Sequence, residues 1–292
     1  MFQDFMTMHY QTIIRSEVLL GQLTNPNWIV VDCRFDLADT DAGRRSYGTN
    51  HISGAHYAHL DEDLSGPISV RSGRHPLPDP VVLCNKLGAW GINRASQVVV
   101  YDAAGGAMAA RLWWLLRWLG HENVAVLDGG WQRWQSQAYP VQQALPVELA
   151  IHYPGEANHA VWIGSDQVAY ALQQDEIVLL DARAAERFEG RVEPIDPVAG
   201  HIPGAINRPL QLNLDNKGCF KTGPQLRQEF EALLAGRSAG EVVHMCGSGV
   251  TACHNLLAME VAGLGGSSLY AGSWSEWIGD PARALSTVKL DD

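Results

Sequence analysis

One cysteine stands where a buried strand is expected to give way to a helix. The apolar run from Val242 to Met245 leads into Cys246, a glycine-containing turn and a helix-like stretch from Ala252 to Ala262. In such a turn, backbone N–H groups converge on the sulfur and the helix N-terminus adds partial positive charge. Both effects favour the thiolate, which is the nucleophilic form of cysteine. The sequence therefore predicts a reactive thiol at Cys246.

The remaining cysteines suggest neither a disulfide framework nor a metal site. The chain has five cysteines, an odd number at wide spacings and without a CxxC pair. Secreted scaffolds and structural zinc sites show even, closely spaced patterns instead, so we expect reduced thiols, a cytoplasmic location and no metal. Cys33 and Cys253 are expected to be buried small hydrophobes, and Cys84 and Cys219 to be structural or partly exposed.

The composition limits the possible partners. The chain has 292 residues, enough for two domains, with 46% hydrophobic residues and a formal net charge of −11. An acidic chain without clustered lysines and arginines is a poor nucleic-acid binder, so we expect a small substrate. The N-terminus lacks the features of a signal peptide, and the apolar segment 109–119 is too short and too charged to span a membrane.

The chain contains an internal repeat. Asp32-Cys33-Arg34 matches Asp181-Ala182-Arg183 at an offset of 149 residues, and the segment His51–Ala55 matches His201–Ala205 at an offset of 150. Trp131-Gln132-Arg133-Trp134 matches Trp274-Ser275-Glu276-Trp277 at an offset of 143. Each half begins with a serine, Ser16 or Ser165, which we expect to cap the following helix.

The repeat predicts an α/β fold of two similar domains. Short apolar runs without alternation indicate strands buried on both faces, and their alternation with helical segments indicates a mainly parallel sheet flanked by helices. We expect an N-terminal domain at 12–140, a proline-containing linker at 141–160 and a C-terminal domain at 161–285. Asp102 takes the place of Cys246 in the first half. The first domain is therefore expected to be an inactive copy, and the second to be catalytic.

The motifs resemble those of a known family. The two H-I-x-G-A motifs, the D-x-R strand ends and the loop Cys246–Thr251 resemble tandem-domain rhodanese-like sulfurtransferases, over about Ile13 to Pro281. The loop sequence C-G-S-G-V-T is similar to that of 3-mercaptopyruvate sulfurtransferases, whereas members that use thiosulfate typically have C-R-K-G-V-T. Thiosulfate is a compact dianion, so positively charged side chains in the loop would favour its binding. Gly247 and Ser248 carry no charge.

The resemblance also implies roles for individual residues. Ser248, His75 in an H-x-L-P motif and Asp61 would form a proton relay beside Cys246. The backbone N–H groups of the loop would hold the negative charge of the persulfide; these belong to Gly247, Ser248, Gly249, Val250 and Thr251.

The resemblance further implies how the substrate carboxylate is held. Arg187 would grip it, with a second arginine expected about nine residues later. Asp196 occupies that position, so Arg191 is considered as the substitute.

The implied activity is the transfer of sulfur from a small donor, 3-mercaptopyruvate or thiosulfate, through a Cys246 persulfide. The acceptor would be cyanide or a thiol, such as a thioredoxin-like protein or a low-molecular-weight thiol, and no cofactor is required. A thiosulfate-preferring enzyme and a non-catalytic persulfide carrier or binding module remain alternatives. A cysteine-dependent phosphatase is disfavoured because Ala252 stands where that class needs an arginine, and a redox enzyme is disfavoured because Cys253 is poorly placed to resolve a disulfide.

Overall fold

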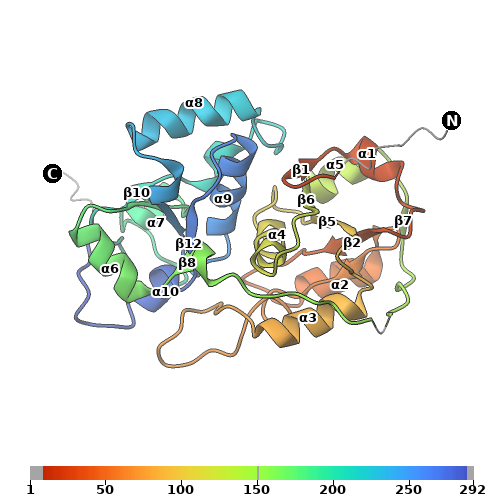
Figure 1. The fold of residues 1–292 in the computed structure, drawn as a ribbon, viewed down its shortest axis with the longest axis horizontal. Helices are drawn as coiled ribbons and strands as arrows, with labels where there is room; N and C mark the ends of the chain where they lie inside the picture. The colour runs from red at the N-terminus through yellow and green to blue at the C-terminus, as the bar shows by residue number, and fades with distance from the viewer. Residues whose placement is uncertain (1–8, 150, 288–292) are drawn as a thin grey trace.

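The computed structural model describes residues 9–149 and 151–287, which form two domains of the same topology (Figure 1). Each domain contains a five-stranded parallel sheet, as the sequence predicts. The strands of the first sheet, in spatial order, are β1 (Ile13–Ile14), β6 (Val124–Leu127), β5 (Gln97–Tyr101), β2 (Trp28–Asp32) and β4 (His56–Tyr57). Those of the second are β8 (Trp162–Ile163), β12 (Ser268–Tyr270), β11 (Val242–Met245), β9 (Val178–Asp181) and β10 (Ile206–Asn207). The matching order confirms the internal repeat.

Helices flank both sheets (Figure 1). In the first domain they are α1 (Ser16–Leu20), α2 (Ala42–Thr49), α3 (Pro80–Ala89), α4 (Ala109–Trp118) and α5 (Gly130–Ser136). In the second they are α6 (Ser165–Gln173), α7 (Ala185–Phe188), α8 (Gly223–Leu234), α9 (Ala252–Val261) and α10 (Ser273–Trp277). Three 3₁₀ turns accompany them: η1 (His159–Val161), η2 (Leu210–Asn213) and η3 (Ala239–Glu241).

The segment between the two sheets is partly anchored to the first domain. Strand β7 (Val141–Gln142), which the sequence analysis assigned to the linker, pairs antiparallel with β3 (His51–Ile52). Further along, Leu149 bridges to Trp90, and the carbonyl of Gly155 accepts a hydrogen bond from the thiol of Cys84. The chain therefore follows the surface of the first domain before it enters the second.

The prediction that Ser16 and Ser165 cap helices was wrong. Each is the first residue inside its helix, and Arg15 and Gly164 occupy the capping positions. The Gln167 side chain accepts the N–H of Gly164 at 2.9 Å and so performs part of the capping role. Ser165 instead receives a hydrogen bond from Arg283 at 2.6 Å.

The two domains share one hydrophobic core along helices α4 and α9, which lie next to each other between the sheets (Figure 1). Trp113, Trp114 and Trp118 of α4 are almost completely buried in this core, together with Leu256 of α9. Their large apolar area is removed from water at the domain interface, as expected for tryptophans in a core or an interface. The interface thus fixes loops of the first domain against the loop that carries Cys246.

No helix among the described residues is long and apolar enough to cross a membrane.

Candidate active site

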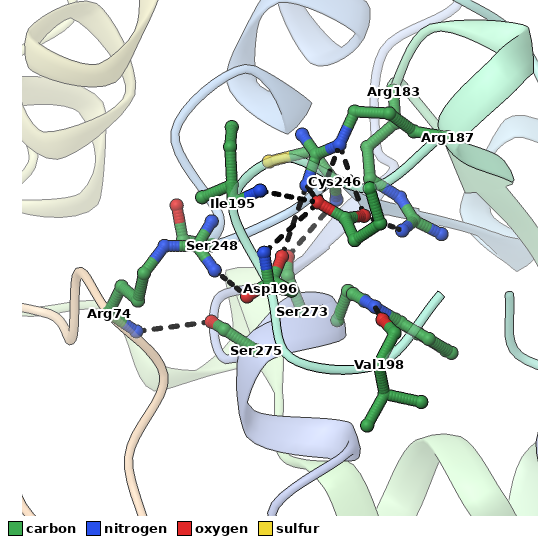
Figure 2. A network of polar contacts seen from close by, with 12 residues as sticks. Arg74, Arg183, Arg187, Ile195, Asp196, Val198, Cys246, Ser248, Ser273 and Ser275 are labelled. Carbon is green, nitrogen blue, oxygen red and sulfur yellow. Dashed lines mark hydrogen bonds and ion pairs between the residues drawn. The ribbon is translucent and has the colours of Figure 1, made fainter. Parts of the chain in front are cut away.

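Cys246 lies directly after β11, at the mouth of the loop that leads into α9 (Figure 2). The N–H of Gly249 donates a hydrogen bond to its sulfur at 3.2 Å. Gly249 has a φ of +76°, and a Cβ at this position would lie 2.2 Å from the carbonyl oxygen of Ala271. Only glycine fits both conditions, so the loop sequence itself sets the direction of this N–H toward the thiol.

Ser273 holds the other side of the cysteine. The N–H of Cys246 donates to the Ser273 hydroxyl at 3.1 Å, and that hydroxyl donates to the carbonyl of Tyr270 at 2.9 Å. Ser273 is fully buried and has a φ of 53°, whereas Gly130 takes the matching place in the first domain with a φ of 52°. A non-glycine residue in this conformation is strained, and such strain is common at functional sites. The sequence analysis missed Ser273, although the repeat aligns it with Gly130.

The first domain shows what this type of loop does to an anion. The carboxylate of Asp102 accepts four backbone N–H groups at 2.7–2.9 Å, from Ala104, Gly106, Met108 and Ala109. The N–H donors thus surround a built-in negative charge where the second domain carries Cys246. The first domain therefore has its anion cradle occupied by its own side chain.

Ser248, His75 and Asp61 are brought together across the domain interface. Nδ1 of His75 lies 2.7 Å from the Ser248 hydroxyl, and Nε2 lies 3.1 Å from the Asp61 carboxylate. An ionised carboxylate can only accept a hydrogen bond, so Nε2 of the neutral ring carries the proton and Nδ1 accepts from Ser248. The three side chains therefore form a continuous chain of proton donors and acceptors two residues from Cys246.

The environment keeps the His75 imidazole neutral. Burial lowers the pKa of His75 to about 4, and the positive charges of Arg111 and Arg74 act in the same direction. The Asp61 carboxylate raises the pKa but does not offset burial. A neutral imidazole has a free lone pair on Nδ1, so it can take the proton of the Ser248 hydroxyl at neutral pH.

Arg111 of α4 fastens the two halves of this site together. Its guanidinium is fully buried and donates to the carbonyl oxygens of His75 at 3.2 Å and of Gly249 at 3.0 Å. It therefore links the histidine loop of the first domain to the cysteine loop of the second. In the sequence Arg111 interrupts an apolar helix, and a charge expected to be buried in this way is the signal that could have identified it.

Two guanidinium groups stand over Gly247, beside Cys246 (Figure 2). A Cβ at Gly247 would lie 3.0 Å from Nη2 of Arg74 and 3.5 Å from Nη1 and Nη2 of Arg187. The Asp196 carboxylate pairs with both arginines, at 3.1 Å from Nη2 of Arg187. The sequence analysis named Arg187 but missed Arg74, which immediately precedes His75.

Arg191 does not belong to this pair. Its side chain is 40% exposed and pairs with Glu189 at 2.5 Å. The expected substitute for the second arginine is therefore not found over the loop, where Arg74 of the other domain lies instead. Proximity in sequence does not indicate this second cation, because it comes from a loop more than one hundred residues earlier.

Other polar residues singled out by the repeat serve the fold. The rings of His51 and His201 hydrogen-bond backbone carbonyls at 2.8 and 2.7 Å. Asp32 and Asp181 each accept the N–H two residues later and pair with Arg34 and Arg183, so they stabilise the turns that follow their strands.

All five cysteines are free and buried. Burial raises the pKa of the Cys253 thiol to about 12, and this thiol donates to the carbonyl of Gly249 at 3.4 Å. Cys84 and Cys219 are 8% and 7% exposed, so they are structural rather than surface thiols.

The topology and the cysteine loop define the class of the protein. Residues 16–137 and 165–280 each match the family model described as "Rhodanese-like domain". These matches cover most of the chain, which therefore belongs to the rhodanese-like domain family.

Named members of this family are similar to the chain over most of its length. The chain is 48% identical to a "Probable 3-mercaptopyruvate sulfurtransferase" of Pseudomonas aeruginosa, over 94% of this chain and 98% of that protein. It is 36% identical to a "Putative thiosulfate sulfurtransferase SseB" of Mycobacterium tuberculosis, over 94% and 96% of the two chains. The structure is similar to the crystal structure of SseA from Escherichia coli, a 3-mercaptopyruvate sulfotransferase, with a TM-score of 0.79 and 29% identity over 91% of this chain and all of that one.

Proposed function

We propose that this protein is a sulfurtransferase that moves sulfur from 3-mercaptopyruvate, through a persulfide on Cys246, to a thiol acceptor. The contact that carries the proposal is the Ser248–His75 hydrogen bond of 2.7 Å within the cysteine loop. Loss of sulfur from 3-mercaptopyruvate leaves a carbanion that must be protonated, whereas sulfite leaves thiosulfate without needing a proton. A hydroxyl-to-imidazole relay beside the nucleophile is therefore useful for the first donor and superfluous for the second.

The first half-reaction is written with Cys246 as the nucleophile. Its thiolate attacks the sulfur of 3-mercaptopyruvate, an S–S bond forms and the C–S bond breaks. The electron pair of the C–S bond passes to the departing carbon as the enolate of pyruvate, and the Ser248 hydroxyl gives it a proton. The proton comes from the S–H group of the donor: it passes through the Ser248 hydroxyl to Nδ1 of the neutral His75 imidazole and returns through Ser248 to the enolate carbon, while the Asp61 carboxylate keeps the imidazole in the tautomer that accepts from the hydroxyl.

The loop is suited to the persulfide that remains. The Gly249 N–H already points at the Cys246 sulfur, and other N–H groups of the corresponding loop in the first domain hold the carboxylate of Asp102. We assign the other loop N–H groups, of Gly247, Val250 and Thr251, to the outer sulfur. Such preorganised donors hold negative charge without reorganisation.

In the second half-reaction a thiolate acceptor attacks the outer sulfur and the Cys246 thiolate leaves. We propose a thioredoxin-like protein or a low-molecular-weight thiol as the acceptor. The five free thiols fit a reducing, cytoplasmic setting. In this reading the first domain, about 12–140, has no reaction of its own and supplies His75 and Asp61 to the catalytic domain at about 161–285.

A steady-state comparison of two donors with one thiol acceptor tests the proposal. Pyruvate release from 3-mercaptopyruvate should exceed sulfite release from thiosulfate, and Cys246→Ser should abolish both. The matched control is Cys84→Ser, at a buried thiol of α3 in the first domain, which should retain both activities. If Cys246→Ser kept the wild-type rate, or if thiosulfate were the better donor, the proposal would be wrong.

A further inference from the structure

The two arginines over Gly247 are already partly occupied by acidic side chains. Arg187 donates through Nε to Glu193 at 3.1 Å, and through Nη2 to Glu193 at 2.8 Å and to Asp196 at 3.1 Å. Arg74 donates through Nη1 to the other oxygen of Asp196. Among the described residues no hydrogen-bond partner is found for Nη1 of Arg187 or for Nη2 of Arg74. These two nitrogens lie near the position that a Cβ of Gly247 would take.

This pattern excludes a bidentate contact between the donor carboxylate and Arg187 alone. A bidentate contact needs two adjacent N–H groups of one guanidinium, and Glu193 and Asp196 occupy the Nε–Nη2 edge of Arg187. Nη2 of Arg74 and Nη1 of Arg187 remain available, and Asp196 holds the two guanidinium groups side by side. A carboxylate above Gly247 can therefore be bound by one nitrogen from each domain.

We infer that the donor carboxylate binds between Nη2 of Arg74 and Nη1 of Arg187, and that Asp196 makes this cross-domain site selective for a monoanion over a dianion. The inference rests on the proposed function, because it concerns the same donor site. Arg74 is thus the second anion-binding residue, and Asp196 is a positioning and selectivity residue.

The charge balance around the site carries the selectivity. Three arginines, Arg74, Arg183 and Arg187, face three carboxylates, and each of the six charges has at least one partner of opposite sign within the group. The carboxylates are Asp181, Glu193 and Asp196. The nominal charge of the six is zero, so this group of side chains offers oriented N–H donors but no surplus positive charge.

This charge balance disfavours the binding of thiosulfate more than the binding of 3-mercaptopyruvate. Coulomb energy scales with the charge of the ligand, so a dianion is repelled by Asp196 twice as strongly as a monoanion at the same distance. The Asp196 side chain is only 2% exposed, so water screens it poorly. The substrate preference that the neutral loop residues suggest is thus reinforced by a buried carboxylate beside the loop.

Kinetics of two variants test the inference. Arg74→Met should raise KM for 3-mercaptopyruvate by about 10- to 100-fold with little change in kcat, because it removes a charged hydrogen bond that is present in the bound substrate as well as in the transition state. Arg74→Lys should recover part of the loss, and Arg71→Met, at an exposed arginine three residues earlier, should leave both constants unchanged.

Asp196→Asn should raise the ratio of kcat/KM for thiosulfate to kcat/KM for 3-mercaptopyruvate by about tenfold, since the removed charge repels the dianion more strongly. A merely structural role for Asp196 would lower both values together and leave the ratio unchanged, which would overturn the selectivity role. An unchanged KM in Arg74→Met would overturn the carboxylate site.

These failures differ from failure of the proposed function. If the wild-type protein released no pyruvate from 3-mercaptopyruvate, the donor assignment itself would fall. If the wild-type protein releases pyruvate and the Arg74 and Asp196 variants behave like it, only the present inference is wrong.

Discussion

The protonation of His75 gives the sharpest test of the proposed relay. The perturbation is a change of pH, and the quantity to follow is the fraction of neutral imidazole. Burial lowers the pKa of His75 to about 4. At pH 6.5 an ordinary histidine is about half protonated, whereas a group with a pKa of about 4 is protonated in well under about 1% of molecules. At pH 5 the protonated fraction of His75 is still only about a tenth.

The relay should therefore stay competent well below neutrality. The direction of the pH effect follows from the chemistry. Protonation of Nδ1 removes the lone pair that accepts from Ser248, so activity should fall as the pH decreases through the His75 pKa. NMR titration of the His75 ring, assigned by its absence in His75→Gln, should give a midpoint near 4. Pyruvate release should show no loss attributable to His75 between pH 7 and about 5.

Two outcomes would refute this reasoning. One is a His75 midpoint near 6.5 in the folded protein, which would mean that burial and the arginine charges do not act as the structure implies. The other is a His75→Gln variant with the wild-type rate of pyruvate release, which would remove the imidazole from the relay. Circular dichroism at each pH separates titration of His75 from acid unfolding.

Three further predictions concern the same loop and its strand. Ser248→Ala should slow pyruvate release by about 100-fold but leave sulfite release from thiosulfate within a few-fold, because only the first leaving group needs a proton; equal losses for both donors would contradict this. Ser273→Ala should lower the free energy of unfolding by about 1–3 kcal/mol, and Ser273→Gly by less, because alanine keeps the strained φ and glycine relieves it while both lose the bond to Cys246; chemical denaturation measures the order. His244 is fully buried and has no hydrogen-bond partner within the described part of the chain, and burial lowers its pKa to about 3. In the unfolded chain His244 takes up a proton below about pH 6.5, whereas in the folded protein it stays neutral down to about pH 3. The free energy of unfolding should therefore decrease as the pH falls between these values, and His244→Leu should make that decrease smaller. An unchanged pH profile of stability would exclude His244 as a cause.

Much of the fold could be read from local patterns. Burial of a strand on both faces requires a continuous apolar run, and the alternation of such runs with helices requires a parallel sheet, so the tandem α/β architecture follows from the hydrophobic pattern and the repeat. Capping was less predictable: Ser16 and Ser165 are typical capping residues, but the strands before them end in positions that place both serines inside the helix.

The sequence by itself predicted the proposed nucleophile. The position of Cys246 between a buried strand and a helix, followed by a glycine-containing turn, is a local property that can be recognised without the structure. The absence of an arginine at position 252 and the neutral residues after Cys246 likewise needed no structure to disfavour a phosphatase and to favour a mercapto acid as the donor.

Only the tertiary structure decided how the rest of the site is assembled. Arg74, His75 and Arg111 reach the cysteine loop from the first domain, because the packing of α4 against α9 closes one domain onto the other. Which distant side chains meet at such an interface depends on the relative placement of two folded units, and no spacing in the chain encodes it. For this reason the sequence points to Arg191, which is close to Arg187 along the chain, and not to Arg74, which is close in space.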